Sequence, residues 1–144
     1  MSLFSLLSVG ASGMSAQRTR AELLVENLAN AETTRTPEGG PYRRKDVVFE
    51  TTATASPFAS VFNSELRSMN GVGVSDIVVD TSDPERRYMP GHPDADKDGY
   101  VAFPKINTAE DMVDLMGAAR GFEANVAAMS AVKDMIQRSI DLAR

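Results

Sequence analysis

The sequence predicts a mainly α-helical fold in which a small β-rich insert separates two long terminal helices. Near both ends of the chain, apolar residues recur at alternating steps of three and four, the spacing that places them on one face of a helix. Between these segments, proline and glycine interrupt the helical pattern, and short runs rich in β-branched residues follow. We therefore expect an N-terminal helical segment over residues 1–35, a central β-rich and loop region over 36–105, and a C-terminal helical segment over 106–144.

The first segment predicts one helix from residue 2 to about residue 31, with a stripe of apolar side chains that only Arg18 interrupts. Gly10 and Gly13 each lower helix propensity by about 1 kcal/mol relative to alanine. We therefore expect the first turns to be partly disordered in the free monomer until another element packs on them. The residues expected to pack against other helices are Phe4, Leu7, Met14, Val25 and Leu28.

The last segment has the longer stripe, a 3.5-residue repeat sustained over four heptads and broken only at Lys133. Further apolar residues beside the stripe widen it toward a second contact face. Thr108, with Asp111 three residues on, resembles a capping box and marks the start of the helix. The helix is expected to pair with the N-terminal helix in a coiled-coil-like manner and to bundle with neighbouring subunits. The residues expected to pack are Met112, Leu115, Phe122, Val126, Met129, Ile136 and Ile140.

The central region predicts short strands over residues 42–52, 72–80 and 100–103, where valine, isoleucine and aromatic residues gather. Residues 53–68 show no firm period, so a loop and a short helix both stay open there. Two long helices around so small an insert cannot enclose a thick core in one copy, and apolar surface should be left for neighbours. The alternative, a self-contained helical pair packed on its own sheet, is less favoured because the C-terminal stripe is long and wide.

Composition excludes several functions. A formal net charge of -5 argues against nucleic acid or an anionic membrane as the main partner, because phosphate binding needs clustered Lys and Arg. The chain has no cysteine, which excludes disulfides and thiolate chemistry. No apolar run approaches the ~20 residues that span a bilayer. The apolar N-terminal residues precede the first basic residues, the reverse of a cleavable signal peptide, so none is expected.

One motif imitates a calcium site. Asp94, Asp96, Asp98 and Gly99 reproduce the first six positions of an EF-hand loop, but the twelfth position, which needs a bidentate glutamate, is Lys105. We expect an acidic turn in which aspartate side chains cap their own backbone and the glycine adopts positive φ. Weak calcium binding by the three carboxylates stays open.

No catalytic, cofactor-binding or metal-binding residue is expected elsewhere. His92 is the only histidine, and the chain has neither a Gly-x-Ser-x-Gly nucleophile elbow nor a glycine-rich phosphate loop. An enzyme is the least favoured class. It would require His92 to be buried in a pocket beside Asp94 or Asp96.

Several motifs carry a resemblance to a known family. They are the N-terminal runs ASGMSAQ (11–17) and ENLANAET (26–33), the central runs GGPYRR (39–44) and YMPGHPDADKDGYV (88–101), and the C-terminal runs EDMVDLM (110–116) and RGFEANV (120–126). Together they resemble the bacterial flagellar basal-body rod proteins over nearly the whole chain, and most closely the proximal-rod members. Small departures, such as Phe122 in place of the more usual tyrosine, leave the helical stripe intact.

The resemblance implies a non-enzymatic subunit of the rod, the tubular drive shaft of the flagellum. It implies export by the flagellar type III system without a cleaved signal, and assembly in the periplasmic space. The implied partners are copies of the chain, other rod subunits, adjacent basal-body components and the export apparatus. No cofactor, nucleic acid or membrane span is implied. The alternatives are another rod subunit and a periplasmic coiled-coil adaptor.

Overall fold

The computed structural model describes residues 3–53 and 70–142. It confirms a mainly helical fold with a small β-rich part between two long helices. Of the stretch predicted as either a loop or a short helix, residues 54–68 lie outside the described residues. The elements in chain order are helix α1 (Leu3–Ala29), strands β1 (Lys45–Ala53), β2 (Asn70–Val79), β3 (Glu85–Tyr88) and β4 (Tyr100–Phe103), and helix α3 (Thr108–Leu142).

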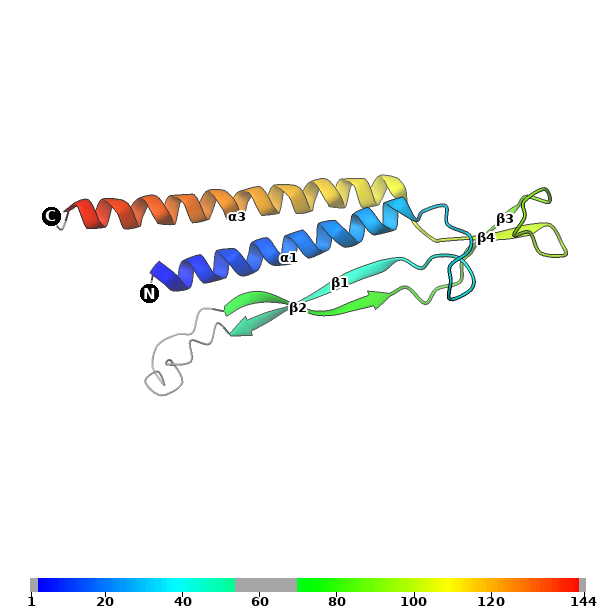
Figure 1. Cartoon of the computed structure of the whole chain (residues 1–144), viewed down its shortest axis with the longest axis horizontal. Helices are drawn as coiled ribbons and strands as arrows, with labels where there is room; N and C mark the ends of the chain where they lie inside the picture. Colours follow the sequence, from blue (N-terminus) through cyan, green and yellow to red (C-terminus); the bar gives the residue numbers. More distant parts are fainter. Residues whose placement is uncertain (1–2, 54–69, 143–144) are drawn as a thin grey trace.

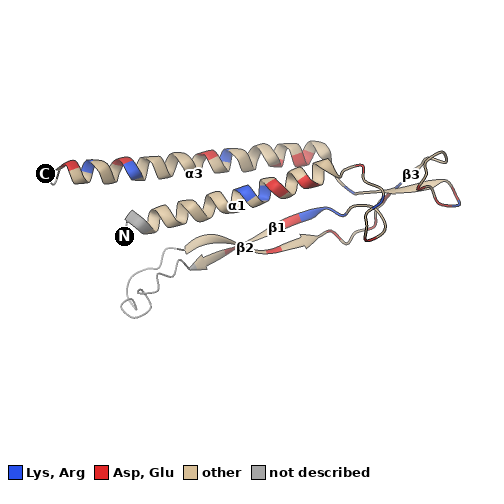
Figure 2. Cartoon of the chain, in the orientation of Figure 1, with Lys and Arg blue, Asp and Glu red and all other residues tan. Residues whose placement is uncertain are grey.

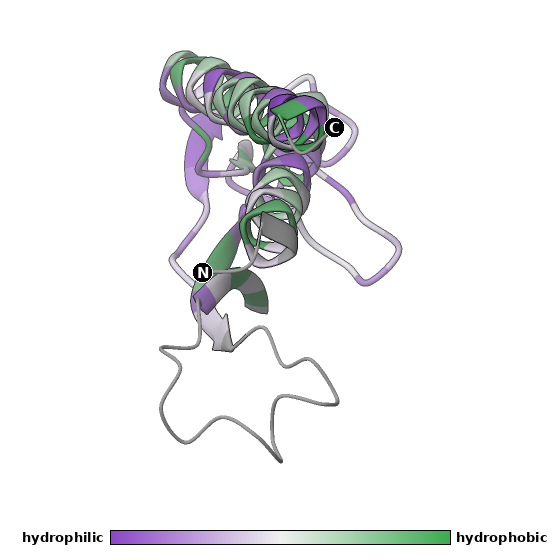
Figure 3. Ribbon diagram, turned by 90° about the vertical axis from the view of Figure 1, so that its left-hand side faces the viewer, coloured by the Kyte–Doolittle hydropathy of each residue, from purple (hydrophilic) through white to green (hydrophobic). Residues whose placement is uncertain are grey.

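The long elements lie in three layers (Figure 1). Helix α1 lies between α3 and the hairpin of β1 and β2, and it contacts all three elements. The end-on view shows the same order of layers (Figure 3). The two helices run antiparallel, and the longer α3 extends past the N-terminal end of α1 (Figure 1). The small ribbon of β3 and β4 projects from the opposite end of the molecule.

Helix α1 approaches α3 through small residues. A methyl group added at Gly13 would lie 3.1 Å from Nδ2 of Asn125, and one added at Gly10 would lie 2.9 Å from Cγ of Met129. On α3, Gly121 faces the Gln17 side chain in the same way. The glycines that weaken the helix locally therefore also let the two helices approach closely.

Helix α3 begins at Thr108, but a different residue caps it. Oδ1 of Asn107 accepts hydrogen bonds from the backbone N–H groups of Ala109 and Glu110, at 3.2 and 3.4 Å. These donors have no partner inside the helix, which is why Asn is favoured at this position. The predicted capping box of Thr108 and Asp111 is wrong, because the Asp111 side chain is buried in the interior instead.

The face of α3 that meets α1 is not the predicted stripe along its whole length. Ala118, which is not in the stripe, is buried, whereas Met112 and Val126 are 58% and 45% exposed. Toward the C-terminal end, Met129 and Ile136 are half-buried. A 3.5-residue repeat drifts by about 20° per heptad on a straight helix, so the stripe begins on the flank of α3 and reaches the α1 face only later. The coiled-coil geometry within one chain therefore stays unconfirmed.

The hairpin joins β1 and β2 in antiparallel register, from Lys45 opposite Val79 to Ala53 opposite Asn70, with an irregularity after Val48. Both strands match the predicted ranges to within three residues. Val47 and Phe49 of β1 are half-buried and line a pocket of about 280 Å³ that α1 also lines. The inner face of the hairpin thus packs on α1.

Strand β4 forms where the sequence predicts it, but its partner β3 was not predicted. Strand β3 carries two arginines and a glutamate over four residues, so it lacks the apolar alternation that marks a strand. Strand β3 is instead stabilised by its antiparallel pairing with β4 and by side-chain contacts between the two strands. The Arg87 guanidinium lies 4.9 Å from the centre of the Phe103 ring, and the Tyr88 and Tyr100 rings meet edge to face.

The buried side chains gather toward one end of the molecule. Except for Ala16, the buried apolar residues lie on the C-terminal half of α1 or on segments beside or beyond it (Figure 1). The chain therefore has its core where α1 ends, β1 begins and α3 begins. These residues are Ala16, Leu23, Leu24, Tyr42, Val101, Phe103 and Ala118.

Candidate assembly surfaces and the junction that positions them

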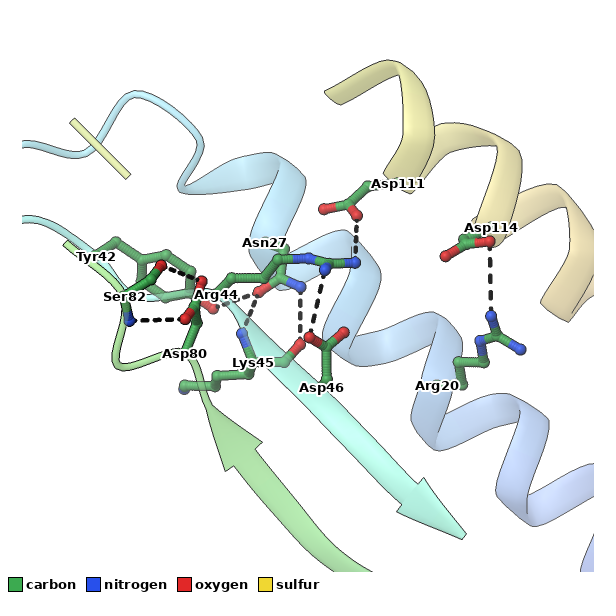
Figure 4. Close-up of polar contacts among 10 residues, drawn as sticks. All are labelled: Arg20, Asn27, Tyr42, Arg44, Lys45, Asp46, Asp80, Ser82, Asp111 and Asp114. Atoms are coloured by element: carbon green, nitrogen blue, oxygen red, sulfur yellow. Dashed lines mark hydrogen bonds and ion pairs between the residues drawn. The ribbon is translucent and has the colours of Figure 1, made fainter. Parts of the chain in front are cut away.

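A buried asparagine joins α1 to the start of the hairpin (Figure 4). Nδ2 of Asn27 donates to the backbone carbonyl of Lys45 at 2.9 Å, and Oδ1 accepts from the backbone N–H of the same residue at 3.0 Å. Oδ1 also accepts a hydrogen bond from the Tyr42 hydroxyl at 3.0 Å. One fully buried side chain thus satisfies both backbone groups of Lys45, and it fixes where the hairpin leaves α1.

The tyrosine in this cluster resists ionisation. Burial raises the pKa of Tyr42 to about 12, because a phenolate would lose its hydration, and the nearby negative charge of Glu26 adds to the effect. The hydroxyl therefore stays protonated and keeps donating to Asn27.

An ion pair ties the start of α3 to the start of β1. Nη2 of Arg44 lies 2.8 Å from Oδ1 of Asp111, a carboxylate that is 1% exposed, and Nη1 lies 3.4 Å from Oδ2 of Asp46. Burial acts to lower the pKa of Arg44, but the two carboxylates more than offset it and the net direction is upward. Within the described residues, Nε of Arg44 and Oδ2 of Asp111 are buried without a hydrogen-bond partner. The pair therefore ties α3 to the hairpin, but it leaves one donor and one acceptor without a hydrogen-bond partner.

We call the cluster of Asn27, Tyr42, Arg44 and Asp111 the junction, because it lies where α1 ends and β1 and α3 begin. Further polar contacts surround it (Figure 4). Nη2 of Arg20, on α1, lies 3.6 Å from Oδ1 of Asp114, on α3. After β2, the Asp80 carboxylate accepts from the backbone N–H and the hydroxyl of Ser82, and these hydrogen bonds lower the pKa of Asp80. Arg43 donates to the backbone carbonyls of Asp80 and Ser82. Every carboxylate drawn in the close-up is thus engaged in holding the backbone or another element.

The predicted acidic turn is confirmed. Oδ1 of Asp96 accepts from the backbone N–H groups of Asp98 and Tyr100, at 2.9 and 2.8 Å, and Gly99 has a φ of 81°. Only glycine adopts this conformation without strain. Across residues 3–53 and 70–142, no group of three or more His, Cys, Asp or Glu side chains is arranged to hold a metal ion.

The residues on which an enzyme would depend serve local structure. Nδ1 of His92 accepts from the backbone N–H of Asp94 at 3.1 Å, and the imidazole meets the edge of the Phe103 ring. The Asp94 carboxylate accepts a hydrogen bond from the hydroxyl of Thr34, in the loop after α1, at 2.8 Å. This turn therefore holds the ribbon of β3 and β4 against the loop that follows α1.

The first candidate assembly surface consists of the exposed apolar side chains of α3, which lie on both flanks of the face that meets α1. Of the residues predicted there, Leu115, Met129 and Ile136 are half-buried, and the other four are exposed. In the last turns, which extend past α1, Leu142 is 88% exposed. The exposed large apolar residues of α3 are Met112, Val113, Met116, Phe122, Val126, Met135, Ile140 and Leu142.

The residues predicted on α1 form no single site. Val25 is exposed, whereas Leu7, Met14 and Leu28 are half-buried. The side chain of Phe4 lies outside the described residues. None of the four described residues is buried, whereas Ala16, Leu23 and Leu24 of the same helix are. Their role in packing subunits stays a prediction.

A second candidate surface lies on the hairpin, which sequence reasoning did not single out. Its exposed apolar residues are Val48, Val72, Val74, Ile77, Val78 and Val79. Sequence reasoning also missed the junction. Asn27 shares a helix face with Leu23 and Leu24, and that spacing could have marked it as an inward-facing polar residue. Arg44 and Asp111 are 67 residues apart, so no local pattern could have paired them.

Within the described part of the chain, no helix is long and apolar enough to cross a membrane. Charged residues are absent from the N-terminal half of α1 and gather toward the junction (Figure 2).

Comparison with known proteins first gives the class. A family model described as "Flagellar basal body rod FlgEFG protein C-terminal" matches residues 97–142, which include all of α3. This match covers the C-terminal third of the chain and indicates the class of flagellar basal-body rod proteins.

Full-length relatives then give the particular family. A flagellar basal-body rod protein FlgC of Bacillus subtilis is 40% identical over 100% of both chains, and that of Borreliella burgdorferi is 37% identical over 97% of both. The FlgC of Escherichia coli O6:H1 is 34% identical over 99% of this chain and 98% of its own. The chain therefore belongs to the FlgC family of flagellar basal-body rod proteins, and it is a structural subunit of the rod rather than an enzyme.

Proposed function

We propose that the chain polymerises through its terminal helical segments, residues 1–35 and 106–144, into the proximal rod. There it forms part of the tubular shaft that carries torque to the hook. Its partners are copies of itself, other rod subunits and adjacent basal-body components. The central region, residues 36–105, faces outward and contacts neighbouring subunits.

One observation supports this proposal above the others: α3 leaves large apolar side chains uncovered along most of its length. Exposed apolar surface of this extent is costly in water, at about 25 cal/mol per Å², and marks sites of protein contact. Met112 near the start of the helix and Leu142 at its end are both well exposed. A shaft that transmits torque needs many such contacts along its axis, and a long helix provides them.

We also propose that the flagellar type III system exports the subunit, without a cleaved signal, to the periplasmic space. The similarity of the N-terminal runs to those of flagellar rod proteins supports this step. Secretion of the chain can be followed separately from its assembly, by immunoblotting periplasmic and extracellular fractions of cells that lack the export ATPase or possess it.

The experiment that tests assembly places a charge on the exposed surface. Val126→Asp puts a carboxylate on a side chain that is 45% exposed in the free subunit, so the monomer should fold normally. In cells whose own copy is deleted, we expect this variant to be exported but absent from purified basal bodies, with loss of swimming. Val126→Ile, the matched control, keeps the surface apolar and should be incorporated.

Normal swimming with Val126→Asp would show that this surface makes no essential contact. Absence of the unmodified chain from purified basal bodies would contradict the proposed function as a whole.

A further inference from the structure

Helix α3 carries two exposed edges of opposite charge, one on each side of the face that meets α1. Every residue of both edges is exposed. Along each edge, positions recur at steps of three and four, so each forms a continuous line on the helix. We call them the acidic edge (Met112, Met116, Ala119, Glu123, Val126, Ser130, Asp134, Gln137 and Asp141) and the basic edge (Val113, Gly117, Arg120, Ala124, Ala128, Ala131, Met135, Arg138 and Leu142).

The charges on the two edges match in spacing. On the acidic edge, Glu123 and Asp141 are 18 residues apart, and on the basic edge Arg120 and Arg138 are also 18 residues apart. Eighteen residues are five turns of helix, or about 27 Å. Two parallel copies of α3 shifted by three residues, about 4.5 Å, would therefore bring both opposite-charge pairs level at once.

These charges are free to meet a partner. Among the described residues, no ion pair includes Arg120, Glu123, Asp134, Arg138 or Asp141. The acidic edge has no Lys or Arg, and the basic edge has no Asp or Glu. Such separation suits a contact that requires the complement of each edge.

The two edges also bring apolar residues together in the same register. The acidic edge presents bulky Met112, Met116 and Val126, which are all at least 45% exposed. The middle of the basic edge presents small residues, which are Gly117, Ala124, Ala128 and Ala131. At the three-residue shift, Val126 lies level with residue 123 of the next copy and packs beside Ala124, so a large side chain faces a small one there. Met116 lies level with Val113, which gives a second apolar contact.

We propose that the acidic edge of one copy packs against the basic edge of the next copy. Because the two edges lie on different sides of one helix, this contact is heterologous and repeats from copy to copy into a ring or a helical filament. Helix α1 lies on the third side of α3, so it leaves both edges accessible (Figure 3). The apolar contacts supply most of the stability, and the exposed ion pairs set the register. The inference rests on the proposed function, because it names the partner of the same helix.

Cross-linking tests the contact directly, since the chain has no cysteine of its own. Val126→Cys and Ala124→Cys, placed in one chain, put a thiol on each edge at nearly the same level. They are two residues apart and point to different sides of the helix, so they cannot form a disulfide within one chain. In oxidised, purified basal bodies we expect a ladder of covalent multimers from the double variant, and monomers from each single variant.

Three outcomes would overturn the inference. Dimers from Val126→Cys alone would show that like edges meet. A disulfide to a protein of different mass would show that another subunit covers the edge. Incorporation of the double variant with no cross-link would show that the edges do not meet. In all three cases the chain is still found in the basal body, so the proposed function stands.

Charge exchange gives an independent test if the cysteine variants fail to assemble. We expect Glu123→Arg with Asp141→Arg to reduce incorporation at least tenfold, because each arginine then faces an arginine of the next copy. Adding Arg120→Glu and Arg138→Glu in the same chain should restore incorporation. No recovery by the fourfold variant, with normal export and helical content, would also overturn the inference.

Discussion

At the scale of single residues, a few buried polar side chains decide how the layers meet. Asn27 satisfies the backbone of Lys45, and Arg44 pairs with the buried Asp111. Such groups add little net stability when all partners are present, but removing one partner leaves the other buried and unsatisfied. The junction is therefore more sensitive to substitution than its few contacts suggest.

Arg44→Met tests this asymmetry. The substitution leaves the Asp111 carboxylate buried without its cation, so we expect the free energy of unfolding to fall by about 3 kcal/mol. The matched control is Arg43→Met, which removes an exposed arginine that donates only to backbone carbonyls, and its effect should stay below about 1 kcal/mol. Urea unfolding followed by circular dichroism measures both. An equal fall in the free energy of unfolding for both variants would show that the buried Asp111 does not depend on Arg44.

Tyr42 predicts a dependence of stability on alkaline pH. Its pKa is about 12 in the folded chain and about 10 in the unfolded chain, so the folded state holds the phenolic proton more tightly. The resulting stabilisation, about 3 kcal/mol, is complete below about pH 9 and is lost as the pH rises toward 12. Urea unfolding between pH 9 and 12 should show this loss relative to Tyr42→Phe. Parallel curves for the two proteins would rule it out.

At the scale of elements, the sequence predicts the helices and strands better than the faces they bury. Both helices and three of the four strands were expected close to their observed ranges. Helix α1, however, buries Ala16, Leu23 and Leu24 rather than its predicted stripe. Periodicity shows that a helix has an apolar side, but it does not show whether that side meets its own chain or another.

Glycine has two effects in these helices: it lowers helix propensity, and at some positions it lets α1 and α3 approach closely. Substitutions at Gly117 and Gly13 separate these effects. Nothing lies within 4 Å of a methyl group added at the exposed Gly117, so Gly117→Ala should raise the free energy of unfolding by about 1 kcal/mol through helix propensity. Gly13→Leu should lower it by about 2 kcal/mol, because the added side chain collides with Asn125 of α3. Thermal unfolding compares the two. Stabilisation by both would mean that α1 and α3 do not pack closely.

At the scale of the whole molecule, stability is concentrated at one end. The junction and most buried side chains lie where α1 ends and α3 begins, while the last turns of α3 extend past α1 (Figure 1). The layers are therefore held together at one end, and the last turns of α3 at the other end are left exposed.

Amide hydrogen exchange on the free subunit should follow this gradient. We expect slow exchange over residues 20–29 and 108–118, near the junction, and fast exchange over residues 130–142, because local opening is easiest where few side chains are buried. After assembly, the fast segment should become protected. Uniform protection along α3 in the monomer would indicate a self-sufficient helical pair.

The sequence by itself determined the family, both helices, three of the four strands and the acidic turn. These follow from local spacing: apolar periodicity for the helices, β-branched runs for the hairpin, and Asp96 with Gly99 for the turn. Only the tertiary structure decided which faces are buried, which residue caps α3 and which charges pair. Arg44 and Asp111 meet because two antiparallel helices bring distant segments together, and β3 forms only because β4 lies beside it. Contacts between segments far apart in the chain have no local pattern, so they appear only once the layers are assembled.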